Sequence, residues 1–450
     1  MVYMNMRFLA LMLVVVTGNV TKAQSERRMT VDELFQLVES NSKTLQKQKI
    51  SVEFAQKGIE AARAQRLPDV NASLSASYNG NVVVMDRDFT NAQDFSSPHF
   101  GNSFALEAQQ VVYAGGAIDA GIRMAELQRD MAQNFEHSTL NIERFKALGQ
   151  YLDLFKIQNR MQVYEQNIAL TSRLIEEIKA KQAQGMALRN DVTRYELQME
   201  TLKLGLRQLQ DQQAILNYQL CHTLGLEQDA VIVPSEELIA NSEASYQRSS
   251  TTLSTLHSSL SEWQQAALAS SPQMEQSQLS TRMAEQQLKL AKSEMLPKLA
   301  VVAADNFSGP FTYDIPPINK NINYWYVGVG LRYNLSSLFK QNKKVHQAET
   351  GIQRSQEQQK VTAENLDNQV QQAWTLYQQT YVDLDTQRKS VQLARQNYQV
   401  VNDRYLNQLA LITDMLDASN IRLNAELQEV DARINIIYAY YKMKFIAGVL

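Results

Sequence analysis

Two stretches of this chain decide its fold because they repeat one pattern. Residues 147–182 are ALGQYLDLFKIQNRMQVYEQNIALTSRLIEEIKAKQ, and residues 370–405 are VQQAWTLYQQTYVDLDTQRKSVQLARQNYQVVNDRY. Asp191 and Asp414 follow them at the same offset of 223 residues, the difference between positions 191 and 414. A tandem duplication of this length predicts two copies of one structural unit packed side by side. Pseudo-equivalent units close most easily around an axis, so we expect a ring-like or tubular assembly.

A second set of matching positions lies upstream of each stretch. Leu67-Pro68 corresponds to Leu296-Pro297 at an offset of 229 residues, the difference between positions 68 and 297. The two offsets differ, so an insertion or deletion lies between the two sets of markers. We therefore expect the two copies to differ in a loop that follows the Leu-Pro dipeptides.

Long proline-free spans predict long helices. Proline is absent from residues 99–233 and 318–450, and proline interrupts helices. Apolar side chains recur there at steps of four and three residues, as Val370, Trp374 and Tyr377 do. This spacing is typical of helices that pack lengthwise against each other.

Each copy is expected to contain a short helix followed by a long helical hairpin. The first copy should have a helix of about 100 Å from Gly116 to Gln184, a reversal, and a shorter helix back to Leu224. A capping box at Thr30-Val31-Asp32-Glu33 predicts an opening helix that runs to about Arg66. The equivalent helix of the second copy should run from about Leu260 to Met295. Both opening helices end at Leu-Pro, which favours an extended chain.

Alternating segments follow the Leu-Pro dipeptides and predict strands. Apolar residues occupy every second position from Val70 to Tyr78, and Trp325 to Leu331 alternate in the same way in the second copy. Such segments have about the length of a tilted strand that crosses a bilayer. We expect one strand hairpin at residues 69–112 and another at residues 298–335.

A soluble β-sandwich is the alternative interpretation of these strands. Each hairpin is isolated between long helices, so no second sheet of the chain would cover its apolar face in water. Closing the hairpins with strands of other chains, in lipid, satisfies both their edges and their faces. On this interpretation Tyr324, Trp325 and Tyr326 would form an interfacial aromatic belt.

The N-terminal residues predict export. Arg7, an apolar run from Phe8 to Val16 and the small-x-small sequence Thr21-Lys22-Ala23 predict a signal peptide at residues 1–23. A short buried helix is the alternative. We divide the remaining chain into a first repeat (24–225), a linker or equatorial collar (226–259) and a second repeat (260–450).

Composition argues against several functions. The formal net charge of −3 gives no basic footprint for nucleic acid. The single cysteine, Cys221, is expected to be a buried inert thiol. The histidines form no metal-ligand or catalytic motif, so we expect no enzyme activity, no catalytic residue, no metal and no cofactor. These histidines are His99, His137, His222, His257 and His346.

The ordered series of these elements, present twice, resembles the TolC-like outer-membrane efflux family over essentially the whole mature chain. Residues 110–116, QVVYAGG, are similar to the family's Pro-Leu-Phe/Tyr-x-Gly-Gly motif, and residues 184–192, QGMALRNDV, to its Gly-x-x-x-x-Asp-Val turn. The resemblance implies a mainly α fold with a β-barrel part. It implies a homotrimer in which four strands per chain build a twelve-stranded transmembrane β-barrel, continued by a long α-barrel through the periplasm.

The resemblance also implies a function and partners. The chain would be a passive exit duct in the outer membrane of a Gram-negative bacterium, extending into the periplasm. A periplasmic adaptor protein and an inner-membrane RND, ABC or MFS transporter would open it, for tripartite efflux or type I secretion. Its partners would be its own copies, these proteins and outer-membrane lipid. An exported coiled-coil adaptor or scaffold protein without a pore is the alternative function.

The resemblance places a constriction at the helix reversals. Asp414 and Asp417 match the family's constriction aspartates, Tyr405 its tip tyrosine, and Asp191 the first-repeat aspartate. The adaptor would contact the tips, which are Gly185, Met186, Ala187, Gln408, Leu409 and Ala410. Gln408 replaces a glycine that is usual there. Ala410 replaces an arginine that some members link to the acids, which argues against a closed tip held by an arginine-centred network.

Two interpretations of the acids stay open. Asp414 and Asp417 lie one helical turn apart, and threefold repetition would place six carboxylates around one axis, a strongly cation-attracting ring. Thr413-Asp414 is also typical of the start of a helix, where an acid stabilises the helix dipole.

Overall fold

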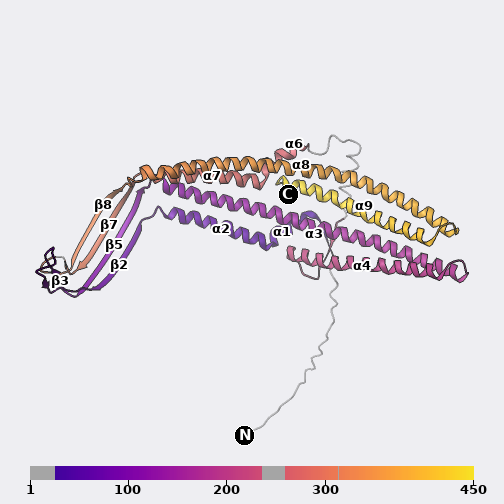
Figure 1. Ribbon diagram of the computed structural model, residues 1–450, viewed down its shortest axis with the longest axis horizontal. Helices are drawn as coiled ribbons and strands as arrows, with labels where there is room; N and C mark the ends of the chain where they lie inside the picture. Colours follow the sequence, from indigo (N-terminus) through magenta and orange to yellow (C-terminus); the bar gives the residue numbers. More distant parts are fainter. Residues whose placement is uncertain (1–25, 236–258, 313) are drawn as a thin grey trace, which may run out of the picture.

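The computed structural model describes residues 26–235, 259–312 and 314–450. The predicted signal peptide and most of the predicted linker lie outside the described residues. The chain forms an elongated arch with strands at one end and helix reversals at the other (Figure 1). No helix in the described ranges combines the length and the apolar character that crossing a membrane requires.

The first repeat contains four helices and a pair of long strands. In chain order its elements are β1 (Glu26–Met29), α1 (Val31–Asn41), α2 (Lys43–Ala64), β2 (Asp69–Tyr78), β3 (Val82–Val84), β4 (Gln93–Phe95), β5 (Phe100–Tyr113), α3 (Ala117–Ala183) and α4 (Arg189–Leu224). The strand β6 (Val231–Pro234) follows in the predicted linker and pairs with β1.

The second repeat has the same order without the small strands. Its elements are α6 (Leu260–Ser270), α7 (Pro272–Ser293), β7 (Lys298–Gly309), β8 (Ile322–Arg332), α8 (Ser337–Leu406) and α9 (Ile412–Ile446). The predicted fold class, mainly helical with a smaller strand part, is confirmed for the chain.

Each opening helix is broken where one continuous helix was expected. Ser42 ends α1 and begins α2, with extended backbone, and its Oγ accepts from the Leu45 N–H at 3.3 Å. Ser271 does the same between α6 and α7, accepting from the Gln273 N–H at 3.3 Å. A serine cap offers the backbone an alternative to the helix, and Pro272 lacks the N–H that a continuous helix would use.

The helices lie side by side in an arched layer (Figure 1). In the half nearer the strands, α3 packs against α2 and α7, and α7 packs against α8. In the half nearer the reversals, α3 packs against α4 and α9, and α9 packs against α8. The two longest helices, α3 and α8, therefore run through both halves and join them.

The four long strands form one antiparallel sheet in the order β2-β5-β7-β8. The central pair, β5 and β7, joins the hairpins of the two repeats, with Ala108 opposite Ala303. Because side chains alternate across a strand, the register places an apolar row on one face of the sheet. That row includes Leu74, Phe104, Leu106, Ala303, Val327 and Val329.

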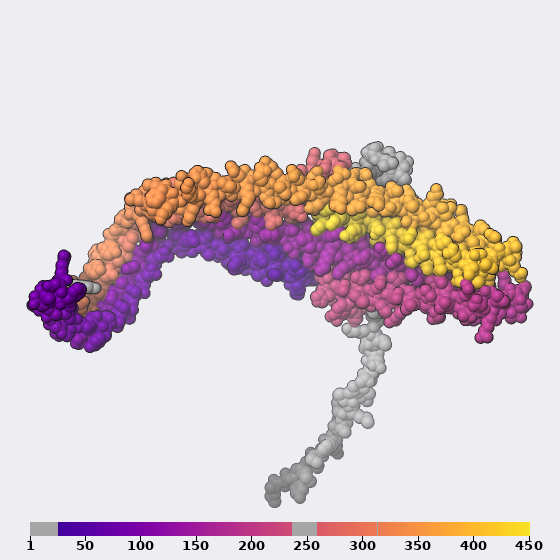
Figure 2. Space-filling view, in the orientation of Figure 1, coloured from indigo at the N-terminus to yellow at the C-terminus, as the bar shows by residue number. Residues whose placement is uncertain are grey.

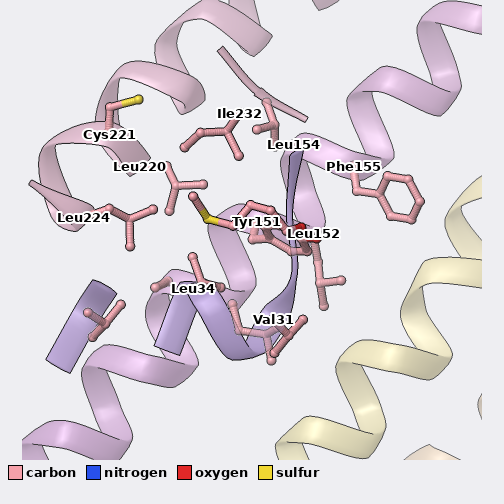
Figure 3. Close-up of a cluster of buried hydrophobic side chains, with 14 of the residues drawn as sticks. Val31, Leu34, Tyr151, Leu152, Leu154, Phe155, Leu220, Cys221, Leu224 and Ile232 are labelled. Carbon is pink, nitrogen blue, oxygen red and sulfur yellow. Dashed lines mark hydrogen bonds between the residues drawn. The ribbon is translucent and has the colours of Figure 1, made fainter. Parts of the chain in front are cut away.

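A buried cluster near the middle of the arch joins β1, α1, α3, α4 and β6 (Figure 3). At its centre the Tyr151 hydroxyl donates to the Met29 carbonyl at 2.7 Å and accepts from the Ser235 N–H at 2.9 Å. Burial raises the pKa of the Tyr151 phenol to about 12. Leu34 and Leu220 are fully buried beside it, and each such side chain contributes roughly 1.5–3 kcal/mol.

Candidate functional site

The reversals of the two repeats meet at one end of the arch (Figure 2). A buried apolar cluster packs them together, with contributions from all four helices. Its buried members are Leu174, Ile178, Val192, Tyr195, Tyr398, Ile412, Met415 and Ala418. The tip of the first repeat and the tip of the second thus form one packed unit within a single chain.

In the first reversal a glycine ends α3. Gly185 has a left-handed backbone at φ 75°, which glycine adopts without steric cost. The following Met186 N–H donates back to the Lys181 carbonyl at 2.8 Å, and so satisfies a free carbonyl at the helix end. The chain then turns and α4 begins at Arg189.

In the second reversal the equivalent position is Gln408, at φ 61°. The Leu409 N–H donates to the Arg404 carbonyl at 2.7 Å, which repeats the hydrogen bond of the first reversal. The Arg404 guanidinium also donates to the Leu409 carbonyl at 3.3 Å. The two turns therefore have the same backbone geometry, although only one of them has the glycine that suits it.

Asp191 and Asp414 occupy equivalent places in the two repeats. The Asp191 carboxylate accepts from the Leu188 N–H at 3.1 Å, and the Asp414 carboxylate accepts from the Leu411 N–H at 3.1 Å. Each acid thus satisfies a free N–H at the start of its helix, where a negative charge also opposes the dipole. Asp417 lies one turn further along α9, and both it and Asp414 are exposed.

Tyr405 lies between the two reversals and contacts the first repeat. The Lys181 ammonium lies 5.5 Å from the centre of its ring and donates to the neighbouring Leu406 carbonyl at 3.4 Å. Burial, reinforced by the negative charge of Asp191, raises the pKa of the Tyr405 phenol. The structure thus brings together Tyr405 and Asp191, which lie far apart in sequence.

The side chains proposed for adaptor contact differ in exposure. Met186 and Leu409 are exposed apolar residues at the two tips, at 50% and 68%. Gly185 and Gln408 are exposed as well, whereas Ala187 and Ala410 are half-buried. Ala187 packs against the cluster that joins the reversals.

Two buried tyrosines beneath the tips were not among the predicted site residues. Tyr195 and Tyr398 belong to the apolar cluster, and burial raises the pKa of both phenols. The Tyr195 hydroxyl has no hydrogen-bond partner within the described part of the chain. Neither tyrosine has a counterpart in the other repeat, since Ala418 and Ile175 stand at the equivalent positions, so the duplication gave no signal for them.

The three aromatic residues of β8 do not share a face. Trp325 lies opposite Asp305 in the row that contains Val327 and Val329, whereas Tyr324 and Tyr326 alternate with it and lie on the other face. All three are exposed. A lipid-facing belt on this strand would therefore rest on Trp325 alone.

No group of three or more histidine, cysteine, aspartate or glutamate residues is arranged to hold a metal ion in the segments that the structure covers.

Comparison with known proteins relates the chain to outer-membrane channels. Residues 263–449, most of the second repeat, match the family model described as outer membrane efflux protein. This part of the chain is similar in sequence to the outer membrane efflux protein family. This is a family of channels and not of enzymes. A comparison with curated proteins found no match.

Solved structures share the fold of the whole arch at low sequence identity. The outer membrane protein VceC of Vibrio cholerae is 16% identical, with a TM-score of 0.71, over 93% of this chain and 96% of that chain. The CmeC outer membrane channel of Campylobacter jejuni is 11% identical, with a TM-score of 0.68, over 93% and 85% of the two chains. The MtrE outer membrane channel of Neisseria gonorrhoeae is 12% identical, with a TM-score of 0.67, over 93% and 88%. The efflux-protein fold therefore includes the first repeat as well.

Proposed function

We propose that this protein is the outer-membrane exit duct of a tripartite efflux or type I secretion system. A periplasmic adaptor and an inner-membrane RND, ABC or MFS pump would recruit and open it. The observation that carries the proposal is the sheet, whose apolar face and outer edges have no cover within the described residues. The duct would cross the outer membrane and extend into the periplasm.

The edges of the sheet support a homotrimer. Among the described strands, β2 pairs only with β5 and β8 pairs only with β7. Unpaired edges cannot face lipid, because no water is present there to bond their N–H and C=O groups. Pairing β8 of one copy with β2 of the next leaves no open edge, and three copies would close a twelve-stranded barrel.

Exposed apolar residues on the outermost helices support the same assembly. On α4, Leu197 and Leu204 lie seven residues apart and are 70% and 59% exposed. On α8, Leu393 and Val400 have the same spacing and are 55% and 57% exposed. Heptad spacing of this kind is typical of a helix seam that packs against another helix. In a trimer, α4 of one copy would cover α8 of the next.

A pore-free exported adaptor or scaffold is the other function that the helices alone would allow. Such a protein has no use for an apolar face on a sheet. Detergent extraction and the oligomeric state distinguish an exit duct from a pore-free adaptor or scaffold. The duct should extract from outer-membrane fractions in detergent as a trimer and should form channels in planar lipid films. A monomer without detergent, or a trimer that forms no channels, would contradict the proposal.

A deletion variant gives the matched control for this experiment. Removing residues 67–112 takes away β2 and nearly all of β5 but leaves the long helical hairpins. We expect the deletion product to remain highly helical by circular dichroism and to be absent from the membrane. Insertion of this product into the membrane would contradict the assignment of these strands.

At the other end, we propose that the packed reversals form the constriction and the adaptor contact. Asp414 and Asp417 are exposed on the first turns of α9, so a threefold arrangement would place their carboxylates around one axis. Tyr405 and Asp191 would position the two tips against each other. Met186 and Leu409 offer apolar contacts to an adaptor.

A further inference from the structure

A buried polar network interrupts the apolar packing between the two helical hairpins. Its centre is Asn167 on α3, which is 4% exposed. Arg422 and Glu426 on α9 approach Asn167 from the other hairpin, and Tyr398 and Arg395 on α8 complete the group. The network therefore joins the hairpin α3–α4 to the hairpin α8–α9.

The Asn167 amide links a cation to an anion. Its Oδ1 accepts from Arg422 Nη2 at 2.8 Å. Its Nδ2 donates to Glu426 Oε2 at 3.3 Å and to the Val163 carbonyl at 2.8 Å. Arg422 and Glu426 lie one helical turn apart on α9. An amide, with an acceptor at one end and a donor at the other, fits between them in one orientation only.

Contacts on α8 hold the two charged groups in place. The Arg422 guanidinium lies 4.1 Å from the centre of the Tyr398 ring, a cation–π contact. Glu426, whose side chain is 11% exposed, accepts from Arg395 Nε at 3.0 Å. Each oxygen of the Glu426 carboxylate therefore has a partner on a different helix.

The directionality of these contacts distinguishes them from the apolar seam around them. Apolar burial is non-directional, so sliding α9 along α3 by one turn could preserve much of it. The same slide would remove both α9 partners of the buried Asn167 amide, and Arg422 and Glu426 would each lose their contact with it. Buried polar groups that lose their partners are costly, and single polar residues in helix seams are known to fix register.

We propose that Asn167, Arg422 and Glu426 form a latch that fixes the register of the two hairpins and thereby sets the separation of the tips. The latch is distinct from the contact between Tyr405 and Asp191. Asn167 lies about 24 Å from the end of α3, and Arg422 about 15 Å from the start of α9. Its effect on the pore rests on the proposed function, whereas its effect on hairpin docking does not.

Replacing the amide with an apolar residue of similar size tests the latch. N167L in the full-length protein removes the amide that links Arg422 to Glu426. We expect hydrogen exchange in α9 residues 412–426 to accelerate on the order of tenfold, and the distribution of single-channel conductances to change. N134L is the matched control, since Asn134 is equally buried on α3 but bonds Glu275 of α7, away from the hairpin contact. It should leave both readouts at the wild-type values.

A pair of substitutions that exchanges donor and acceptor gives a stricter test. N167D keeps an acceptor for Arg422 but turns a second carboxylate toward Glu426, so exchange in α9 should accelerate. Adding E426Q supplies an amide that can donate to the new carboxylate and accept from Arg395. The double variant N167D/E426Q should therefore exchange more slowly than N167D, although the hydrogen bond to the Val163 carbonyl is not restored.

Hydrogen exchange in α9 tests the latch, and channel formation tests the proposed duct, so the two proposals can fail independently. If α9 exchanged hydrogen in N167L at the wild-type rate, the latch would be overturned. It would also be overturned if α9 of the double variant exchanged as fast as α9 of N167D. If wild type forms no channels while N167L and the double variant exchange as expected, the proposed function fails and the latch stands.

Discussion

A glutamine occupies the left-handed turn position of the second reversal, where the first reversal has a glycine. At φ 61° the Gln408 backbone is costly for a residue with a Cβ, by roughly 1–2 kcal/mol. The surrounding hydrogen bond from the Leu409 N–H to the Arg404 carbonyl holds this conformation. The second turn is therefore the more strained of the two.

Q408G should relieve this strain. We expect hydrogen exchange in residues 404–411 to slow about fivefold, which corresponds to about 1 kcal/mol of local stability. G185A is the mirror experiment, because alanine at φ 75° introduces the strain, and exchange around residue 185 should accelerate. Faster exchange in Q408G would show that the turn is not strained.

Tyr151 provides a test through pH. Its pKa is raised to about 12 in the folded protein and is about 10 in an unfolded chain, so the folded state binds the proton more tightly. The stability that this difference provides is fully present below pH 10 and is lost as pH rises toward 12. Between pH 9 and pH 11 the loss from this residue should be about 1 kcal/mol.

Y151F removes that contribution. At pH 8 the variant should be less stable by about 1–3 kcal/mol, because the Met29 carbonyl and the Ser235 N–H lose a buried partner. From pH 9 to pH 11 it should lose less stability than wild type. Urea unfolding of both proteins at the three pH values checks both statements, and equal pH slopes would contradict the second.

At the level of single residues, the sequence indicated only part of the site at the helix reversals. Thr413-Asp414 suggested a helix start as well as a constriction acid, and Asp414 is found to cap α9. The contact of Tyr405 with Lys181 joins the two repeats, and such contacts depend on how the hairpins pack. A single amino-acid sequence carries no signal for them.

The helices show which elements sequence patterns can locate. The long helix expected from Gly116 to Gln184 is observed as α3, Ala117–Ala183, because neither proline nor clustered glycine interrupts it. The breaks at Ser42 and Ser271 were missed, because the apolar spacing continues across each of them. A serine followed by a new helical turn, with Pro272 in the second case, was the available signal.

Neighbouring positions on β8 test the orientation of the sheet. Val327 belongs to the apolar row, and Gly328 lies on the opposite face, where an added Cβ would meet nothing within 4 Å. V327R would place a charge in lipid at a cost of roughly 2–4 kcal/mol, so the amount of protein in the outer-membrane fraction should fall. G328R, the matched control, should insert at wild-type levels. Equal insertion of both variants would contradict the assignment of faces.

At the scale of the whole molecule, the repeat pattern alone could not predict how many copies assemble. The duplication predicted a ring or tube, and the exposed rows on α4, α8 and the sheet edges are the surfaces that such a ring would cover. How many copies close the ring depends on the curvature of each arch. Curvature arises from side-chain packing summed over the chain, and no local motif encodes it.

Charge neutralisation at the tips tests the assembled constriction. D414N and D417N together keep an oxygen that can accept from the Leu411 N–H but remove two carboxylates per chain. If these acids surround one axis, blocking the single-channel current of D414N/D417N should require a trivalent-cation concentration at least about tenfold higher than in wild type. D119N/D211N, which neutralises exposed acids on α3 and α4 away from the tips, should leave block unchanged. Unchanged block in D414N/D417N would remove both acids from the constriction.

The pairing of β5 with β7 has a consequence for how such a ring is built. Because this contact joins hairpins of different repeats, half of the six hairpin junctions in the proposed trimeric ring would already be made inside the three chains. Only three junctions need an encounter between separate chains. The two repeats of one chain are covalently linked, so their hairpins meet at a high effective concentration. An ancestor with one repeat per chain would have had to collect six separate subunits, so the duplication itself simplified assembly.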